Sequence, residues 1–137
     1  MCIRDREAYD NFNPEIVAEY DDEKTTQLLN NVGIIRNRRK IEASIQNAKR
    51  FLEIQIEFGS FDRYIWRFVN NKPVVNSWIY DQDIPSKTIL SDTISSDLKR
   101  RGFKFIGSTI IYAHLQATGI VNDHIVDCFR YKQLVDL

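Results

Sequence analysis

The sequence predicts an all-α fold in a single domain. Apolar residues recur every three or four positions along most of the chain, which is the spacing of one helix face, and the alternation typical of strands is rare. The 137 residues are enough for one domain with a hydrophobic core and too few for two ordinary ones. No repeat, low-complexity tract or linker divides them. We therefore expect residues 1–137 to form one helical domain.

Three helices are expected in the first 58 residues. One begins near Pro14, because proline suits the first turn of a helix. The next follows the acidic run at 21–23, whose negative charge favours the positive end of the helix dipole, and it ends before Gly33. A long helix then runs over about 37–58 and stops at Gly59. Its helical stripe of apolar residues consists of Ile41, Ile45, Ala48, Leu52 and Ile56.

The second half of the chain predicts three more helices around one irregular stretch. Residues 60–68 predict a short helix that is rich in aromatic side chains. Residues 69–90 contain two prolines and no sustained period, so we expect no regular element there, and the role of Trp78 stays open. Helices at about 91–101 and 108–118 each end at a glycine. The turn between these last two helices is the first candidate site.

That turn has the features of an anion-binding site. Two glycines bracket it, and glycine permits positive φ and a close approach of other chains. The start of the following helix presents free N–H groups with a partial positive charge, to which hydroxyl groups and one lysine would add. A helix-hairpin-helix module holds a DNA phosphate in this way without reading the base sequence. The candidate DNA-binding residues are Gly102, Lys104, Gly107, Ser108 and Thr109.

The neighbours of the turn predict how it is held. We expect Phe103 and Phe105 to anchor it by burying their rings. The helix at 108–118 carries apolar side chains on nearly all sides, and such a helix is usually buried. The ordinary alternative to a phosphate site is a glycine helix cap followed by a loop lysine, which binds nothing.

Charge and cysteine usage narrow the classes of function. The formal net charge is zero, so it argues neither for nor against nucleic acid. Basic residues cluster at 36–40 and 99–104. Arg36, Arg38, Arg39 and Lys40 could face DNA phosphates, but the ordinary interpretation of this first cluster is a solvated helix start. We find no apolar run as long as a membrane span and no signal-peptide pattern. Two distant cysteines favour a reducing compartment, and we expect the cytoplasm.

A second candidate site lies near the end of the chain. His124 and Cys128 stand four residues apart, which is the spacing of one helix face, and Asn122 or Asp123 can cap a last short helix here. Both side chains can bind zinc, but a structural zinc needs four ligands and this pair supplies two. A buried cysteine beside a surface histidine is the ordinary alternative. Asp123 is expected either to cap the helix or to orient the His124 ring.

Four blocks of sequence carry a resemblance to a known family. They are REAYDNFNPEIVA at 6–18, GIIRNRRKIEASIQNA at 33–48, GSFDRYIWRFV at 59–69 and LKRRGFKFIGSTIIYAHLQATGIVNDH at 98–124. Together they resemble the DNA-3-methyladenine glycosylase I family, with 6–137 as its C-terminal portion and 1–5 unmatched. The resemblance implies a helix-hairpin-helix glycosylase. Such an enzyme hydrolyses the N-glycosidic bond of 3-methyladenine in alkylated double-stranded DNA and starts base-excision repair.

The resemblance also implies a structural zinc, with His124 and Cys128 as its two C-terminal ligands. In the family the other two ligands belong to an N-terminal segment, and we expect this segment to be missing from the chain. Catalytic residues and most of the base pocket are expected in the same missing segment. Tyr112 and Gln116 are candidate pocket residues, although packing or a buried hydrogen bond is their ordinary role. Cys2 could replace a lost zinc ligand.

Two other functions remain open beside the enzyme. The chain could be a non-catalytic helix-hairpin-helix module that binds DNA, or an inactive remnant. Release of 3-methyladenine would indicate the enzyme, whereas salt-dependent DNA binding without base release would indicate the module. In each case we expect a monomer that has no membrane partner.

Overall fold

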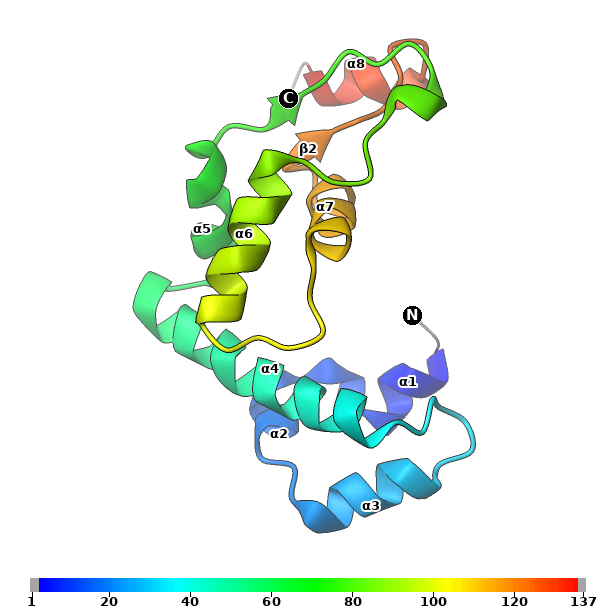
Figure 1. The fold of residues 1–137 in the computed structure, drawn as a ribbon, viewed down its shortest axis with the longest axis vertical. Helices are drawn as coiled ribbons and strands as arrows, with labels where there is room; N and C mark the ends of the chain where they lie inside the picture. The colour runs from blue at the N-terminus through cyan, green and yellow to red at the C-terminus, as the bar shows by residue number, and fades with distance from the viewer. Residues whose placement is uncertain (1–2, 136–137) are drawn as a thin grey trace. The chain divides into compact units, whose positions relative to one another are not determined.

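The computed structural model describes residues 3–135 and shows a mainly helical chain (Figure 1). This confirms the all-α prediction, with the addition of one pair of two-residue strands. The elements are α1 (Ile3–Ala8), η1 (Asp10–Phe12), α2 (Pro14–Ala18), α3 (Asp22–Asn30), α4 (Arg38–Phe58), α5 (Phe61–Trp66), η2 (Arg67–Val69), β1 (Val74–Val75), η3 (Asp81–Asp83), α6 (Ile89–Arg100), α7 (Ser108–Ala117), β2 (Val121–Asn122) and α8 (Phe129–Val135), where η denotes a short 3-10 turn.

The chain forms two compact units. The N-terminal unit contains the residues up to Phe61 together with Leu98–Phe105, and the C-terminal unit contains Asp62–Asp97 and the residues from Ile106 onward. Each unit therefore holds one part of the turn between α6 and α7. No helix between residues 3 and 135 combines the length and the apolar character that crossing a membrane requires.

Side-chain caps set the helix starts of the N-terminal unit. The Asn13 side chain accepts a hydrogen bond at the start of α2, where Pro14 takes the first position. Asp21 caps α3 through Lys24 N at 2.8 Å, and Asn37 caps α4. A capping oxygen satisfies an N–H group that has no partner inside the helix. The predicted starts of these three helices are confirmed.

The core of the N-terminal unit follows the apolar stripe of α4, except at its end. Ile41 is fully buried, and α2 packs against α4 through Val17 and Ala48. The prediction fails at Ile56, which is 86% exposed, whereas Ile54 takes the buried position. A second cluster joins this helix to α3 and to the chain on either side of α3, and contains Tyr9, Leu28, Ile34 and Ile41.

The C-terminal unit contains α5, most of α6, α7 and the two strands. Its buried residues include Tyr64 and Ile94. The strands pair in parallel, with Val74 opposite Val121, and β2 is buried while β1 is exposed. The irregular stretch expected at 69–90 is largely confirmed, but it contains β1 and the first residues of α6.

Two predictions for this unit are wrong. The α7 helix is not buried on all sides: Ile111, Tyr112 and Leu115 form its buried face, while Ile110 is 59% exposed. The last short helix is present as α8, but it does not begin at Asn122 or Asp123 as expected, because Asn122 belongs to β2 and its carbonyl accepts a hydrogen bond from Asn76 N. Residues 123–128 are irregular, and α8 begins only at Phe129.

Candidate functional site

The hairpin turn leaves α6 through a glycine that the structure requires. Gly102 has φ +93°, and its N–H donates to Lys99 O at 3.0 Å while Phe103 N donates to Leu98 O at 3.0 Å. This pair of bonds is the usual glycine-based end of a helix. A Cβ at Gly102 would lie 3.0 Å from Arg50 Nε on α4. A side chain here would be strained by the positive φ and would require Arg50 to shift, so glycine suits the position best.

Asn47 of α4 holds the next part of the turn. Its Nδ2 donates to Lys104 O at 3.0 Å, and its Oδ1 accepts from Lys104 N at 2.8 Å. One side chain therefore satisfies both backbone polar groups of Lys104 and fixes the direction in which the lysine leaves the turn. The Lys104 side chain is exposed, and it forms no ion pair with any residue between 3 and 135. Sequence analysis missed Asn47, although an asparagine inside a long helix is a signal of side-chain bonding to other backbone.

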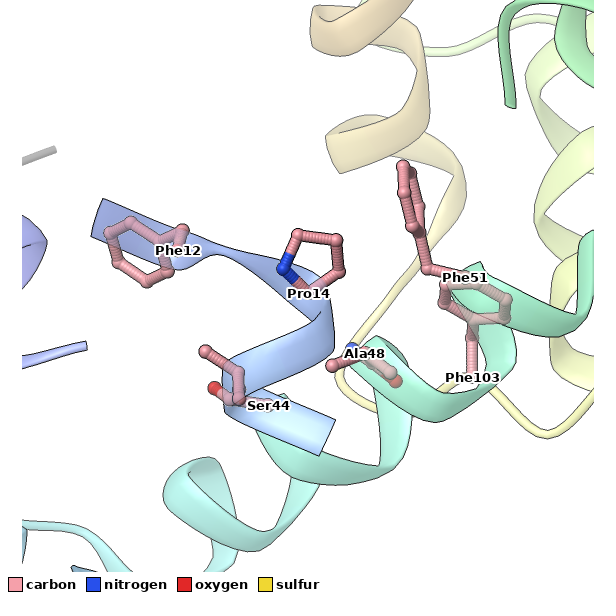
Figure 2. A pocket seen from close by; sticks show the side chains of 8 residues that line it. Phe12, Pro14, Ser44, Ala48, Phe51 and Phe103 are labelled. Atoms are coloured by element: carbon pink, nitrogen blue, oxygen red, sulfur yellow. The ribbon is translucent and has the colours of Figure 1, made fainter. Parts of the chain in front are cut away.

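The two phenylalanines of the turn differ in burial. Phe103 is partly buried and lines an apolar pocket of the N-terminal unit (Figure 2). Phe105 is 57% exposed and has φ +54°, so the prediction that its ring anchors the turn is wrong. The Asn47 bonds provide the anchor in its place. The pocket is lined by Phe12, Pro14, Val17, Ser44, Asn47, Ala48, Phe51 and Phe103, all apolar or uncharged.

The C-terminal unit contributes the start of α7. Gly107 is its N-cap residue in an extended conformation, and no side chain caps the helix. The Ser108 hydroxyl lies 2.7 Å from the Ser91 hydroxyl, which is itself bonded to Thr88, so Ser108 is tied to α6. Thr109 is exposed. The first N–H groups of α7 therefore have no side-chain acceptor in the described chain, as an anion site needs.

Unlike the position of Gly102, the position of Gly107 has a backbone conformation and free space that would accept a side chain. Its φ is −155°, which any residue adopts, and a Cβ there would meet no atom within 4 Å. The folded unit therefore has room for a side chain at this position. A glycine is needed here only if something outside the unit approaches the backbone.

A buried carboxylate organises the other end of α7. Asp123 is 7% exposed, and both of its oxygens accept two hydrogen bonds. Oδ1 accepts from Asn76 Nδ2 and Trp78 Nε1, both at 2.7 Å. Oδ2 accepts from Tyr112 OH at 2.5 Å and Gln116 Nε2 at 2.8 Å. Four donors from two segments, the stretch after β1 and α7, therefore meet on one side chain, which we call the Asp123 hub.

The hub changes the interpretation of several residues. Burial alone would raise the pKa of Asp123, but its four hydrogen bonds outweigh burial and hold the pKa below its usual value. Burial, and then the bond and charge of Asp123, raise the pKa of Tyr112. The expectation that Asp123 is a helix cap or orients the His124 ring does not match these contacts. Tyr112 and Gln116, the candidate pocket residues, direct their polar ends to Asp123.

The predicted metal pair is brought together by a turn. Cys128 Sγ lies 3.6 Å from His124 Nδ1, although no helix contains them. The turn closes through Cys128 N to Ile125 O at 2.8 Å, and Val126 N donates to Trp78 O at 2.9 Å. A tetrahedral zinc, with bonds of about 2.0 Å to nitrogen and about 2.3 Å to sulfur, would hold two such atoms about 3.5 Å apart. The geometry therefore fits two ligands of a zinc site.

The rest of a metal site is not found in the described residues. No group of three or more His, Cys, Asp or Glu side chains with metal-binding geometry occurs between residues 3 and 135. Cys2, the predicted substitute ligand, lies outside the described residues.

Comparison with known proteins places these features in a family. The model of a family described as methyladenine glycosylase matches residues 4–131. The chain belongs to this family. DNA-3-methyladenine glycosylase 1 of Escherichia coli is 42% identical over 126 residues, which are 92% of this chain and 67% of that protein. The Haemophilus influenzae DNA-3-methyladenine glycosylase is 42% identical over 123 residues, 90% of this chain and 66% of that protein.

Solved structures of the family share the fold. A crystal structure of 3-methyladenine DNA glycosylase I superposes on this chain with a TM-score of 0.84 at 42% sequence identity. The aligned residues are 90% of this chain and 68% of the crystal-structure chain. The 3-methyladenine DNA glycosylase I of Staphylococcus aureus gives a TM-score of 0.86 at 32% sequence identity, over 92% of this chain and 67% of the Staphylococcus chain. A variant of 3-methyladenine DNA glycosylase I in complex with 3-methyladenine gives a TM-score of 0.86 at 32% sequence identity, over 90% of this chain and 67% of the variant's chain. The chain thus spans about two thirds of the length of its relatives.

Proposed function

We propose that this chain serves in a DNA glycosylase that releases 3-methyladenine from alkylated double-stranded DNA, in base-excision repair, and that its hairpin binds the DNA backbone. Membership of the methyladenine glycosylase family supports the reaction. The observation that carries the DNA-binding part is the Lys104 peptide held by Asn47 and followed by an uncapped α7. The Lys104 backbone is held within the N-terminal unit, and the uncapped start of α7 belongs to the C-terminal unit.

Each unit would supply one kind of donor to the DNA backbone. Lys104 supplies an ammonium group on a fixed backbone, and the first N–H groups of α7 supply partial positive charge. Thr109 adds an exposed hydroxyl, whereas the Ser108 hydroxyl already contacts Ser91. These contacts carry no base identity. They keep the duplex in place while a damaged nucleotide leaves the stack.

The reaction needs little general acid or base catalysis. Methylation at N3 makes the adenine cationic, so the base is already a good leaving group. The enzyme has to flip the nucleotide and hold the cationic base, for which aromatic faces and a carboxylate are suited. We assign no catalytic residue in this chain, because the Asp123 carboxylate is occupied by four donors and the pocket in Figure 2 has no charged lining residue.

This occupied carboxylate favours a second candidate function, a DNA-binding module without base release. The two candidates make different predictions for one assay. Incubation with DNA that carries labelled 3-methyladenine should release the free base if the chain is catalytic. Binding to the same DNA that weakens with salt, without base release, would indicate the module.

The DNA-binding part is tested by Lys104→Ala. We expect weaker binding to duplexes of any sequence, and a salt slope of log K that is shallower by about 0.9, the value for one phosphate contact. The control is Lys72→Ala, another exposed lysine, which lies between η2 and β1. Equal slopes for wild type and Lys104→Ala would remove the hairpin from the interface.

We also propose that His124 and Cys128 are two ligands of a structural zinc. Zinc would supply a cross-link between segments of the folded protein. The 3.6 Å separation of Sγ and Nδ1 supports the proposal. Cobalt titration tests it without an activity assay, because a bound thiolate gives a charge-transfer absorption. Cys128→Ser should abolish this band, and a band that survives in Cys128→Ser would contradict the assignment. The cytoplasmic location and the monomeric state stay predictions.

A further inference from the structure

One face of α4 lies against the hairpin turn within the N-terminal unit. Asn47 binds both backbone polar groups of Lys104, and Arg50 Nε lies 3.0 Å from the position that a Cβ of Gly102 would take. Arg39 lies two helical turns before Gln46 on α4, and its side chain lines the same open hollow as Lys104 and Phe105. The hairpin and the first turns of α4 therefore form one continuous surface.

The charges on this surface are available to a ligand. Arg39 and Lys104 are both exposed, and neither has an ion pair in the part of the chain that the structure describes. Glu42 also lines the hollow, but it faces Arg38 at 3.8 Å. Two unneutralised cations therefore share one hollow with a largely exposed aromatic ring, Phe105.

We propose that Arg39 binds a second phosphate of the DNA strand that Lys104 holds, with the Phe105 ring packed against the sugar between the two phosphates. This inference rests on the proposed DNA binding and extends it from the hairpin onto α4. Guanidinium groups match the two oxygens of a phosphate. The contact is independent of sequence, as a glycosylase that scans DNA requires. The left-handed backbone of Phe105 keeps its ring outside the unit, where it can meet a sugar.

Arg38 provides a matched control on the same helix. It is the neighbouring residue, it carries the same charge and it is exposed. Its side chain lines a different hollow, which contains Asp21 and Asp22, and it lies 3.8 Å from Glu42. Acidic surroundings make this position unsuited to phosphate. Arg38→Ala and Arg39→Ala therefore change net charge equally at neighbouring positions that line different hollows, although Arg38→Ala also removes the ion-pair partner of Glu42.

The experiment measures binding of the whole chain to a short undamaged duplex by fluorescence anisotropy over a series of salt concentrations. Arg39→Ala should make the salt slope shallower by about 0.9, and Arg39→Ala with Lys104→Ala by about 1.8. Arg39→Lys should restore the slope, and Arg38→Ala should leave it unchanged. Phe105→Ala should weaken binding at every salt concentration with the slope unchanged. Circular dichroism checks that each variant is folded.

The contrary outcomes separate this inference from the function on which it rests. If Lys104→Ala lowers the slope and Arg39→Ala does not, the α4 contact is wrong and the hairpin contact stands. If Arg38→Ala lowers the slope as much as Arg39→Ala, the effect is one of net charge and the inference is overturned. If Phe105→Ala binds as tightly as wild type, the aromatic contact is overturned. If the wild-type chain shows no salt-dependent binding, both proposals fail.

Discussion

At the scale of residues, the Asp123 hub concentrates the polar interactions of the C-terminal unit. Burying any of its four donors without an acceptor would cost free energy, and the Asp123 carboxylate accepts a hydrogen bond from each of them. Such hydrogen bonds to a charged acceptor are about twice as strong as neutral ones. The hub thus fixes the segment around Trp78 and the C-terminal half of α7 to the chain that carries His124.

Asp123→Asn should destabilise the protein by about 2–5 kcal/mol. The amide keeps the shape of the side chain, but its NH2 group faces two donors that lose their acceptor, whichever way it is turned. Urea unfolding followed by circular dichroism measures the loss. Asp83→Asn is the control, since Asp83 is exposed on η3. A loss of under about 1 kcal/mol for Asp123→Asn would show that the hub contributes little.

Asp10 makes stability depend on acid pH. Hydrogen bonds from Tyr20 and then Lys24 lower its pKa, and Lys24 Nζ lies 3.0 Å from its Oδ2. A carboxyl whose folded pKa is lowered stabilises the protein above its unfolded pKa of about 3.9, and this stabilisation is lost as pH falls through the folded pKa. Urea unfolding between about pH 5 and pH 2 should show the loss, and Tyr20→Phe should reduce it. Identical pH profiles for Tyr20→Phe and wild type would contradict this role.

At the scale of elements, the two glycines of the hairpin should respond differently to alanine. Gly102→Ala should destabilise the chain by about 1–2 kcal/mol, because of its positive φ and the Arg50 side chain. Gly107→Ala should leave stability unchanged, because the position is extended and open.

Substitution of Gly107 should affect DNA affinity even though it leaves stability unchanged. We expect Gly107→Ala, and more so a bulky residue there, to weaken binding in a chain that is still fully folded. Thermal unfolding and anisotropy measure the two effects on the same samples. Full DNA affinity in a Gly107 variant with a bulky side chain would place the start of α7 away from the DNA.

The helices could be predicted because their signals are local. Asn13, Asp21 and Asn37 cap helices from within the next few residues, and Gly59 ends α4 with φ +83°. The candidate site depends on partners far apart in sequence. Asn47 and Lys104 are 57 positions apart, and no local pattern identifies Lys104 as the partner of Asn47. The spacing of His124 and Cys128 predicts a helix, whereas a turn that bonds to the backbone of Trp78 brings the two side chains together.

At the scale of the whole molecule, zero net charge restricts DNA binding to a local patch. With phosphate contacts at Arg39 and Lys104, the slope of log K against log salt should be close to −2. Anisotropy of the wild-type chain at several salt concentrations gives this value. A slope steeper than about −4 would mean that further basic residues reach the DNA.

The parallel pairing of β1 with β2 has a consequence for how the protein folds. Asn76 and Asp123, which this pairing brings together, are 47 positions apart, so a long loop must close before they meet. Closing long loops costs entropy and slows contact formation. We expect the stretch that carries the thiol and the imidazole to reach Trp78 late, and cobalt absorption by a refolding sample would follow this step if the pair binds metal as proposed.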